Sequence, residues 1–218
     1  MKPYSMQELE ECSFLSKIFG SKPTENGWKE LNNLLAAAPD ALAVSADDVH
    51  HALKKWGVKF NDDNFNQRSG IYRKLADVVF TEVQNKEDSL WAQLAHLAEI
   101  LELPPHLAKQ ADKAAKTAAY FVRCRDLLAG NEKLDIKQLN DLFGYDYEDS
   151  LSMRKQVFQA HFNQKFDEIS SAQRYTPDEE AALRADCATL DIPYELKNNI
   201  VSALEKYRSL WNAEHMPL

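Results

Sequence analysis

The residues in this chain with the clearest catalytic potential are a cysteine and a histidine in its last third. Nucleophilic catalysis needs a serine or cysteine beside a base that a third group orients. Cys187 lies on a predicted helix face with Leu183 and Leu190, and His161 adjoins Phe162. Apolar neighbours of this kind are typical of a buried thiol and a packed imidazole. The sequence therefore predicts structural roles for both residues.

Three consecutive carboxylates, Asp178, Glu179 and Glu180, raise the question of acid–base catalysis. Glycosidase-type chemistry needs two carboxylates on opposite sides of a cleft. These three instead follow Thr176 and Pro177. A threonine, a proline and then acidic residues are typical of a helix start, because negative charge interacts favourably with the helix dipole there. We predict that they cap a helix.

Two segments have the residue types of a metal site without its spacing. His50 and His51 are adjacent, so they point in different directions on a helix, whereas a zinc site needs ligands that converge. The string at residues 61–66 is similar to a calcium loop, but the positions of the required Gly and Glu hold Gln67 and Arg73. A helix start rich in Asp and Asn is the better interpretation.

Cysteine and glycine usage also argue against a cofactor site. Cys12, Cys124 and Cys187 are odd in number and far apart, which favours buried thiols in a reducing compartment. The six glycines form no phosphate-binding loop. The sequence predicts no catalytic, cofactor-binding or metal-binding residues, and a protein that is not an enzyme.

Composition narrows the class of protein. The chain has 218 residues, with 26 Lys and Arg against 34 Asp and Glu, a formal charge of −8. This balance argues against nucleic acid as a partner, because phosphate binding depends on Lys and Arg. The most apolar stretch, residues 34–44, contains Pro39 and Asp40, so no membrane span is expected. Glu8, Glu10 and Glu11 argue against a signal peptide.

Helix signals occur along most of the chain. Ser5 with Glu8 forms a capping-box pattern that predicts a first helix up to Gly20, and a second is expected over residues 25–38. Ser45 with Asp48 opens a third helix, which Gly57 closes. No segment alternates with a period of two, so we predict an all-α fold.

Four short strings end predicted helices in the same way, and they indicate an internal repeat. They are Trp56-Gly57-Val58, Leu101-Glu102-Leu103, Phe143-Gly144-Tyr145 and Leu190-Asp191-Ile192, at intervals of 45, 42 and 47 residues. Each unit would be a shorter helix, a turn and a longer return helix. The shorter helices are expected near 45–56, 88–101, 135–143 and 176–190, and the returns near 64–83, 105–128, 149–169 and 193–211.

A single helical hairpin cannot bury its apolar face, so such units must stack. We therefore predict stacked antiparallel helical hairpins in about four repeats of about 45 residues, a HEAT-like and elongated arrangement. Residues 1–40 would form an N-terminal helical pair that acts as a cap, and residues 41–218 the helical-repeat domain.

The turn pattern Leu-Asp/Glu-Leu/Ile-Pro-x-x-Leu, at residues 101–107 and 190–196, and the opening Thr-Pro-Asp-Glu-Glu at 176–180 carry a resemblance. Over residues 45–211 the chain resembles the stromal repeats of the large scaffold subunit of the chloroplast inner-envelope import translocon, and it is also similar to TerB-like tellurite-resistance domains. The third turn departs from the pattern, because no proline follows Tyr145.

The translocon resemblance implies a scaffold that gathers chaperones and receives incoming precursor proteins. The chain shows no membrane anchor of that family, so we expect it to correspond to a soluble portion, located in the chloroplast stroma and facing the inner envelope. An acidic surface would favour basic targeting peptides as partners. Aromatic residues in the second half could line a peptide groove or form core: Phe143, Tyr145, Tyr147, Phe158, Phe162 and Phe166.

The TerB-like resemblance implies a different class of function. It predicts a compact helical domain that binds a metal or a small ligand in a stress response. Carboxylates converging between two hairpins would favour it, and Asp178, Asp186 and Asp191 are the acids to inspect.

Overall fold

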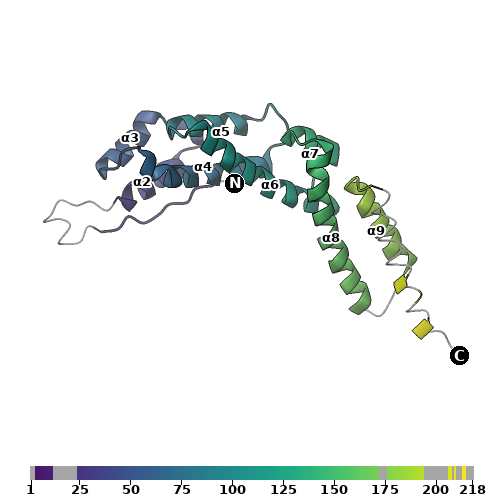
Figure 1. Ribbon diagram of the computed structural model, residues 1–218. Helices are drawn as coiled ribbons and strands as arrows, with labels where there is room; N and C mark the ends of the chain where they lie inside the picture. Colours follow the sequence, from purple (N-terminus) through teal and green to yellow (C-terminus); the bar gives the residue numbers. More distant parts are fainter. Residues whose placement is uncertain are drawn as a thin grey trace. The chain divides into compact units, whose positions relative to one another are not determined.

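The computed structural model describes residues 3–11, 24–171, 176–193 and five positions near the end, 206, 207, 209, 213 and 214. These residues form α-helices and no strand, as predicted, and none of the helices is long and apolar enough to span a membrane (Figure 1). The helices are α2 (Glu25–Ala37), α3 (Ala46–Lys55), α4 (Phe65–Glu82), α5 (Ser89–Ile100), α6 (Pro105–Leu128), α7 (Ile136–Phe143), α8 (Tyr147–Ser171) and α9 (Pro177–Thr189).

The chain divides into two compact units, Met1–Ala119 and Tyr120–Leu218, here called unit 1 and unit 2. The division falls inside α6, so the first part of this helix belongs to unit 1 and the rest to unit 2. Two short 3-10 helices, Ala41–Ala43 and Asp62–Asn64, lie in unit 1.

Two of the predicted helix starts, at Ser45 and Thr176, are confirmed by their hydrogen bonds. The Asp48 amide donates to the Ser45 hydroxyl at 3.2 Å, and the Ser45 amide donates to the Asp48 carboxylate, which completes a capping box. Thr176 and Glu179 form the same arrangement at the start of α9. Each box satisfies amides that have no partner inside the helix.

The four predicted turns share one backbone geometry. In each, the middle residue has a positive φ and its amide donates to a carbonyl three residues earlier, while the next amide donates to a carbonyl five residues earlier. This is the Schellman ending of a helix. The middle residues are Gly57 (φ 74°), Glu102 (46°), Gly144 (60°) and Asp191 (49°). Glu102 and Asp191 adopt the left-handed region without being glycine, which is uncommon.

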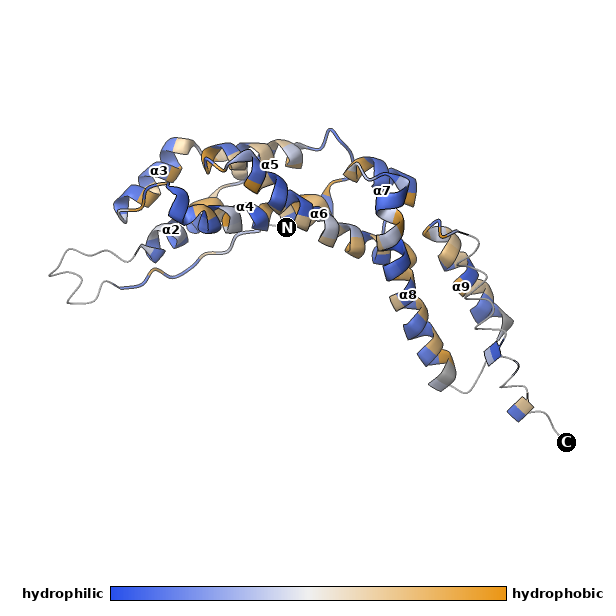
Figure 2. Ribbon diagram, in the orientation of Figure 1, coloured by the Kyte–Doolittle hydropathy of each residue, from blue (hydrophilic) through white to orange (hydrophobic). Residues whose placement is uncertain are grey.

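Each unit has a hydrophobic core between its helices. Figure 2 shows hydrophobic and hydrophilic residues on both α4 and α8, as expected of helices with one buried face. Leu31, Leu53, Val79 and Leu97 are buried in unit 1, and Tyr120, Leu139, Phe158 and Leu190 in unit 2.

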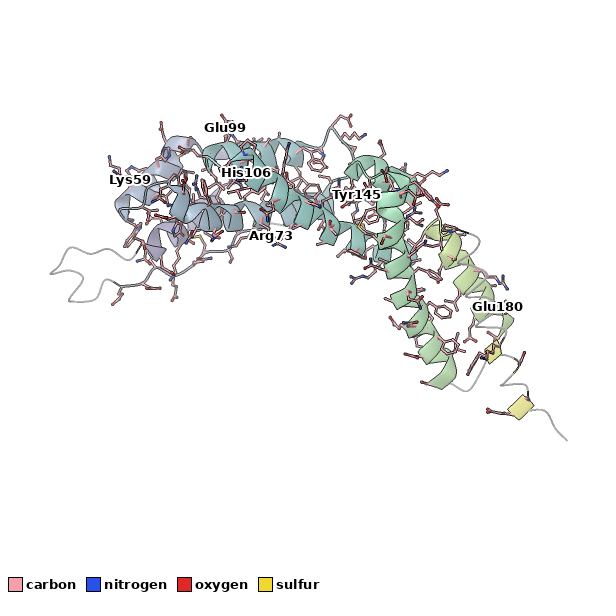
Figure 3. The ribbon with its side chains drawn as sticks, viewed as in Figure 1. Lys59, Arg73, Glu99, His106, Tyr145 and Glu180 are labelled. Carbon is pink, nitrogen blue, oxygen red and sulfur yellow. The ribbon has the colours of Figure 1, made fainter. Side chains whose placement is uncertain are left out.

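The aromatic residues of the second half contribute largely to the core of unit 2. Phe143, Phe158 and Phe162 are buried, and the Tyr145 ring (Figure 3) contacts the Tyr120 ring edge-on at 5.2 Å. Tyr147 remains 45% exposed. The interpretation as core is thus confirmed for three of the six residues.

The helix predicted from Ser5 is wrong in the part that the structure describes. Residues 4–11 lie outside any helix, and main-chain groups of this segment bond to side chains of α2 instead. The remainder of that predicted helix, up to Gly20, lies outside the described residues, as does most of the fourth return helix at 193–211. The cap at residues 1–40 and the four-unit repeat stay predictions.

Candidate functional site

The cysteine and histidine considered for nucleophilic catalysis have other surroundings. His161 Nε2 lies 2.8 Å from Asp186 Oδ2, so the imidazole of α8 is paired with a carboxylate of α9. Cys187 follows Asp186 in α9 and is only 2% exposed. A thiol buried to this degree has no path to a substrate in this conformation.

The buried thiols lead to a first prediction. Burial raises the pKa of Cys124 to about 12, and Cys187 is also buried. Because the thiolate is the reactive form, neither should react with a thiol reagent at pH 8. In a Cys12→Ser chain, titration with a chromogenic disulfide is expected to detect no thiol until denaturant is added. Rapid reaction of a native thiol would contradict the buried position of these two cysteines.

The acidic and histidine-rich strings have structural roles. Glu179 belongs to the capping box of α9 and Glu180 pairs with Arg184 one turn later. His50 lies on the surface of α3, 3.1 Å from Glu102. The calcium-like string forms a 3-10 helix that leads into α4, a helix start as predicted. Among the described residues no group of three or more His, Cys, Asp or Glu could hold a metal ion.

One buried arginine of unit 1 holds a turn in place. Arg68 of α4 is 3% exposed, and its Nη1 donates to the Leu101 and Glu102 carbonyls at 3.1 and 2.9 Å. Its Nη2 donates to the Asn61 carbonyl at 2.8 Å, seven residues earlier. The guanidinium also lies 4.4 Å from the Phe65 ring centre. The charge is therefore satisfied by carbonyl oxygens and an aromatic face, which suit arginine.

Unit 2 contains a matching arginine. Arg154 of α8 is fully buried, and its Nη1 donates to the Leu190 and Asp191 carbonyls, both at 2.8 Å. Its Nη2 lies 3.4 Å from the Tyr147 carbonyl, again seven residues earlier, and its guanidinium lies 4.8 Å from the Tyr147 ring centre. In both arginines the Nε has no hydrogen-bond partner among the described groups. In both turns a buried arginine thus binds main-chain carbonyls at equivalent positions.

The most informative arrangement lies at the start of the chain. Residues 3–11, here called the N-terminal segment, run beside α2 without regular secondary structure (Figure 1). Asn33 accepts from the Gln7 amide at 2.6 Å and donates to the Gln7 carbonyl at 2.8 Å. Asn26 does the same with Glu10, both at 2.8 Å. Each asparagine therefore binds both main-chain groups of one residue.

The spacing of these two asparagines matches that of an extended peptide. Asn26 and Asn33 are seven residues apart, which is two helical turns and a rise of about 10.5 Å, so they share one face of α2. Gln7 and Glu10 are three residues apart, which in an extended chain is about 10 Å. The segment runs antiparallel to α2, and the two asparagines bind Gln7 and Glu10 along it.

Further contacts fix the segment beside α2. Asn32 donates to the Ser5 carbonyl at 2.6 Å, and its oxygen accepts from Lys74 of α4 at 3.0 Å, which orients the amide. Lys29 pairs with Glu10 at 2.8 Å. This pair is partly exposed and contributes little to the free energy of binding, but it favours an acidic side chain at that position.

Tyr4 anchors the segment to the core. It is 8% exposed, and its hydroxyl donates to the Ile71 carbonyl of α4 at 2.9 Å. A cavity of about 390 Å³ adjoins the ring and is lined by Leu35 of α2 and Leu75 of α4, among others. We call the site formed by Asn26, Asn32, Asn33, Ile71 and Leu75 the α2–α4 groove.

Tyr4 and two other buried tyrosines predict a loss of stability at high pH. Burial raises the pKa of Tyr4, Tyr72 and Tyr120 above the usual value, and for Tyr72 the bond to Asp112 adds to this. In the unfolded chain they ionise near pH 10. The unfolded state therefore loses protons first, so stability is complete below about pH 10 and falls as the pH rises further.

This prediction is checked by urea denaturation at pH 8, 10 and 11. The urea midpoint is expected to fall at pH 10 and above. The absorbance at 295 nm, which reports tyrosine ionisation, should rise at a higher pH in the folded chain than in the unfolded chain. A Tyr72→Phe chain should lose less of its stability between pH 8 and 11. An equal fall in both chains would show that Tyr72 ionises freely in the folded state.

Sequence reasoning missed the α2–α4 groove, although a signal for it was present. Asparagine is a poor residue for a helix interior, because its side chain competes for main-chain groups. α2 contains Asn26, Asn32 and Asn33 within 13 residues, and Asn26 and Asn32 are buried. Poor helix formers on a buried helix face indicate hydrogen bonds to another part of the chain.

Comparison with known proteins adds no further information on the site. No protein-family model, curated protein or solved structure matches the chain.

Proposed function

We propose that this protein is a non-enzymatic helical interaction protein that binds extended polypeptide segments in the α2–α4 groove. The observation that carries the proposal is the double pairing of Asn26 and Asn33 with the main chain of Glu10 and Gln7. Here the N-terminal segment occupies the groove as an intramolecular ligand. A partner with the same extended shape would use the same contacts.

The chemistry of the groove suits a polypeptide partner. Main-chain N–H and C=O groups are present in every peptide, so Asn26 and Asn33 supply affinity with little dependence on sequence. Selectivity would come from the anchor position of Tyr4, which is buried, and from Lys29, which favours an acidic residue six positions later. This combination is useful for binding many unrelated chains.

A stacked-repeat arrangement is part of the same proposal. The four turns with one geometry, and the equivalent main-chain hydrogen bonds of Arg68 and Arg154, support hairpins built to one plan. We propose about four hairpins in an elongated stack. Small-angle X-ray scattering is expected to give a radius of gyration clearly above about 17 Å, the value for a compact domain of this length. A value near 17 Å would contradict the elongated stack.

The biological setting is proposed from the resemblance of residues 45–211 to the stromal repeats of the chloroplast import translocon. On that basis the partners are incoming precursor polypeptides or chaperones, in the stroma beside the inner envelope. A groove that binds main-chain groups supports precursor segments as a class of partner. The TerB-like alternative has no converging carboxylates in its favour among the described residues.

The proposal is tested by binding in trans. The tethered segment competes at an effective concentration of about millimolar, so it must first be weakened. A full-length Tyr4→Ala chain should bind a fluorescent peptide with the sequence of residues 3–11, measured by anisotropy. Adding Asn33→Ala should weaken this binding at least tenfold, because two hydrogen bonds are lost. Binding that Asn33→Ala leaves unchanged would overturn the proposal.

A further inference from the structure

Unit 2 contains a second groove, here called the α6–α8 groove, which lies between the end of α6 and the middle of α8. Its volume is about 780 Å³. Phe121 and Leu128 of α6 and Val157 and Ala160 of α8 give it an apolar floor. The lining residues span about 11 Å along α6 and about 13 Å along α8, room for an extended peptide of about three to four residues.

The ionisable residues that line this groove are all basic. They are Arg125, His161 and Lys165, and no carboxylate lines it, although the whole chain has a charge of −8. His161 is paired with Asp186, and Lys165 with Glu168 at 3.0 Å. Arg125 forms no ion pair with any residue that the structure describes. The rim therefore has a cation available for a negatively charged partner.

Counted along the helix from the buried arginine, the groove on α8 lies at the same position as the Tyr4 anchor on α4. Arg68 and Arg154 make the same contacts, so they give a common register for α4 and α8. Three residues after Arg68 is Ile71, whose carbonyl accepts from Tyr4. Three residues after Arg154 is Val157, which lines the α6–α8 groove. The position beside α4 that the Tyr4 side chain occupies therefore corresponds to the open α6–α8 groove beside α8.

We propose that the α6–α8 groove binds an extended, acidic segment of a partner protein that inserts an aromatic side chain onto the apolar floor and directs carboxylates toward Arg125. This rests on the proposed function, since it takes the α2–α4 groove as the example of how such a segment binds. The N-terminal segment itself has this chemistry, with Tyr4 followed by Glu8, Glu10 and Glu11.

The test uses the full-length chain with Tyr4 intact, so that its own segment holds the α2–α4 groove. The probe is a peptide of residues 3–11 with a photoreactive benzoylphenylalanine in place of its tyrosine. Crosslinks are expected at Phe121, Val157 or Ala160. Arg125→Glu should weaken binding about tenfold, and so should Ala160→Glu, a change at an exposed position. Lys155→Glu makes the same charge change as Arg125→Glu, but on α8 outside the groove, and should have no effect.

The outcomes separate this inference from the proposed function. Crosslinks at Ile71 or Leu75 that require Asn33 would show that the peptide displaces the N-terminal segment from the α2–α4 groove. This result would support the proposed function and overturn the present inference. Binding unaffected by Arg125→Glu would also overturn it. If the chain self-associates and Arg125→Glu abolishes this self-association, the groove binds a second copy of the chain and the inference of a different partner is overturned. Absence of any crosslink or binding at millimolar peptide would overturn it as well.

Discussion

Replacing Arg68 with methionine is expected to lower the free energy of unfolding by about 3 kcal/mol, one of the two largest effects that we predict. Methionine keeps much of the apolar stem but removes the donors to three main-chain carbonyls. A buried acceptor left without its donor costs about 1–3 kcal/mol, and part of this is recovered when the turn relaxes. Lysine should restore little, because it lacks the planar fork that reaches all three oxygens.

Urea denaturation measures this loss as a shift of the midpoint. Arg73 is the matched control, because it lies on the same helix but is half exposed, with only a 3.9 Å contact to Asp77 (Figure 3). Arg73→Met should change the free energy of unfolding by less than about 0.5 kcal/mol. Equal effects at the two positions would contradict the role assigned to Arg68.

Replacing Tyr4 with alanine is expected to release the N-terminal segment from the α2–α4 groove. The change removes a buried ring and its hydrogen bond to Ile71, together worth about 3 kcal/mol. This raises the population of the released segment about 100-fold. Hydrogen exchange at the Gln7 and Glu10 amides should accelerate by the same factor, because exchange requires their bonds to Asn33 and Asn26 to open.

Met6 provides the control within the same segment. Its side chain is 70% exposed, so Met6→Ala should leave both exchange rates within about twofold of the native chain. If the Gln7 and Glu10 amides exchange rapidly in the native chain, or if the two substitutions act alike, the segment is not anchored through Tyr4.

The sequence predicted the helices and turns well because their signals are local. The capping boxes at Ser45 and Thr176 depend on residues three positions apart. The turns at Glu102 and Asp191 were predicted from the similarity of their flanks to the glycine-containing turns. The carbonyls of these two turns also accept hydrogen bonds from an arginine over 30 residues away, a contact that no local pattern indicates.

The candidate site could not be predicted in the same way, because it depends on contacts distant in sequence. Ser5 and Glu8 have the spacing of a capping box, yet the main chain there bonds to asparagines of α2 and Tyr4 reaches α4. These tertiary contacts outweigh a local signal worth about 1 kcal/mol. Arg68 and Arg154 gave no local signal either, since an arginine on an amphipathic helix is usually exposed.

The central claim is that the α2–α4 groove recognises the main chain of an extended peptide. The most direct test measures binding of N-methylated peptides of residues 3–11 to the full-length Tyr4→Ala chain. Methylation at Gln7 removes a donor to Asn33, whereas the Glu8 amide makes no hydrogen bond to the described residues.

We predict that methylation at Gln7 weakens binding at least tenfold, that methylation at Glu8 has little effect, and that Asn33→Ala removes the difference between the two peptides. Equal loss at both positions, or a difference that persists in the Asn33→Ala chain, would contradict recognition of the main chain by α2.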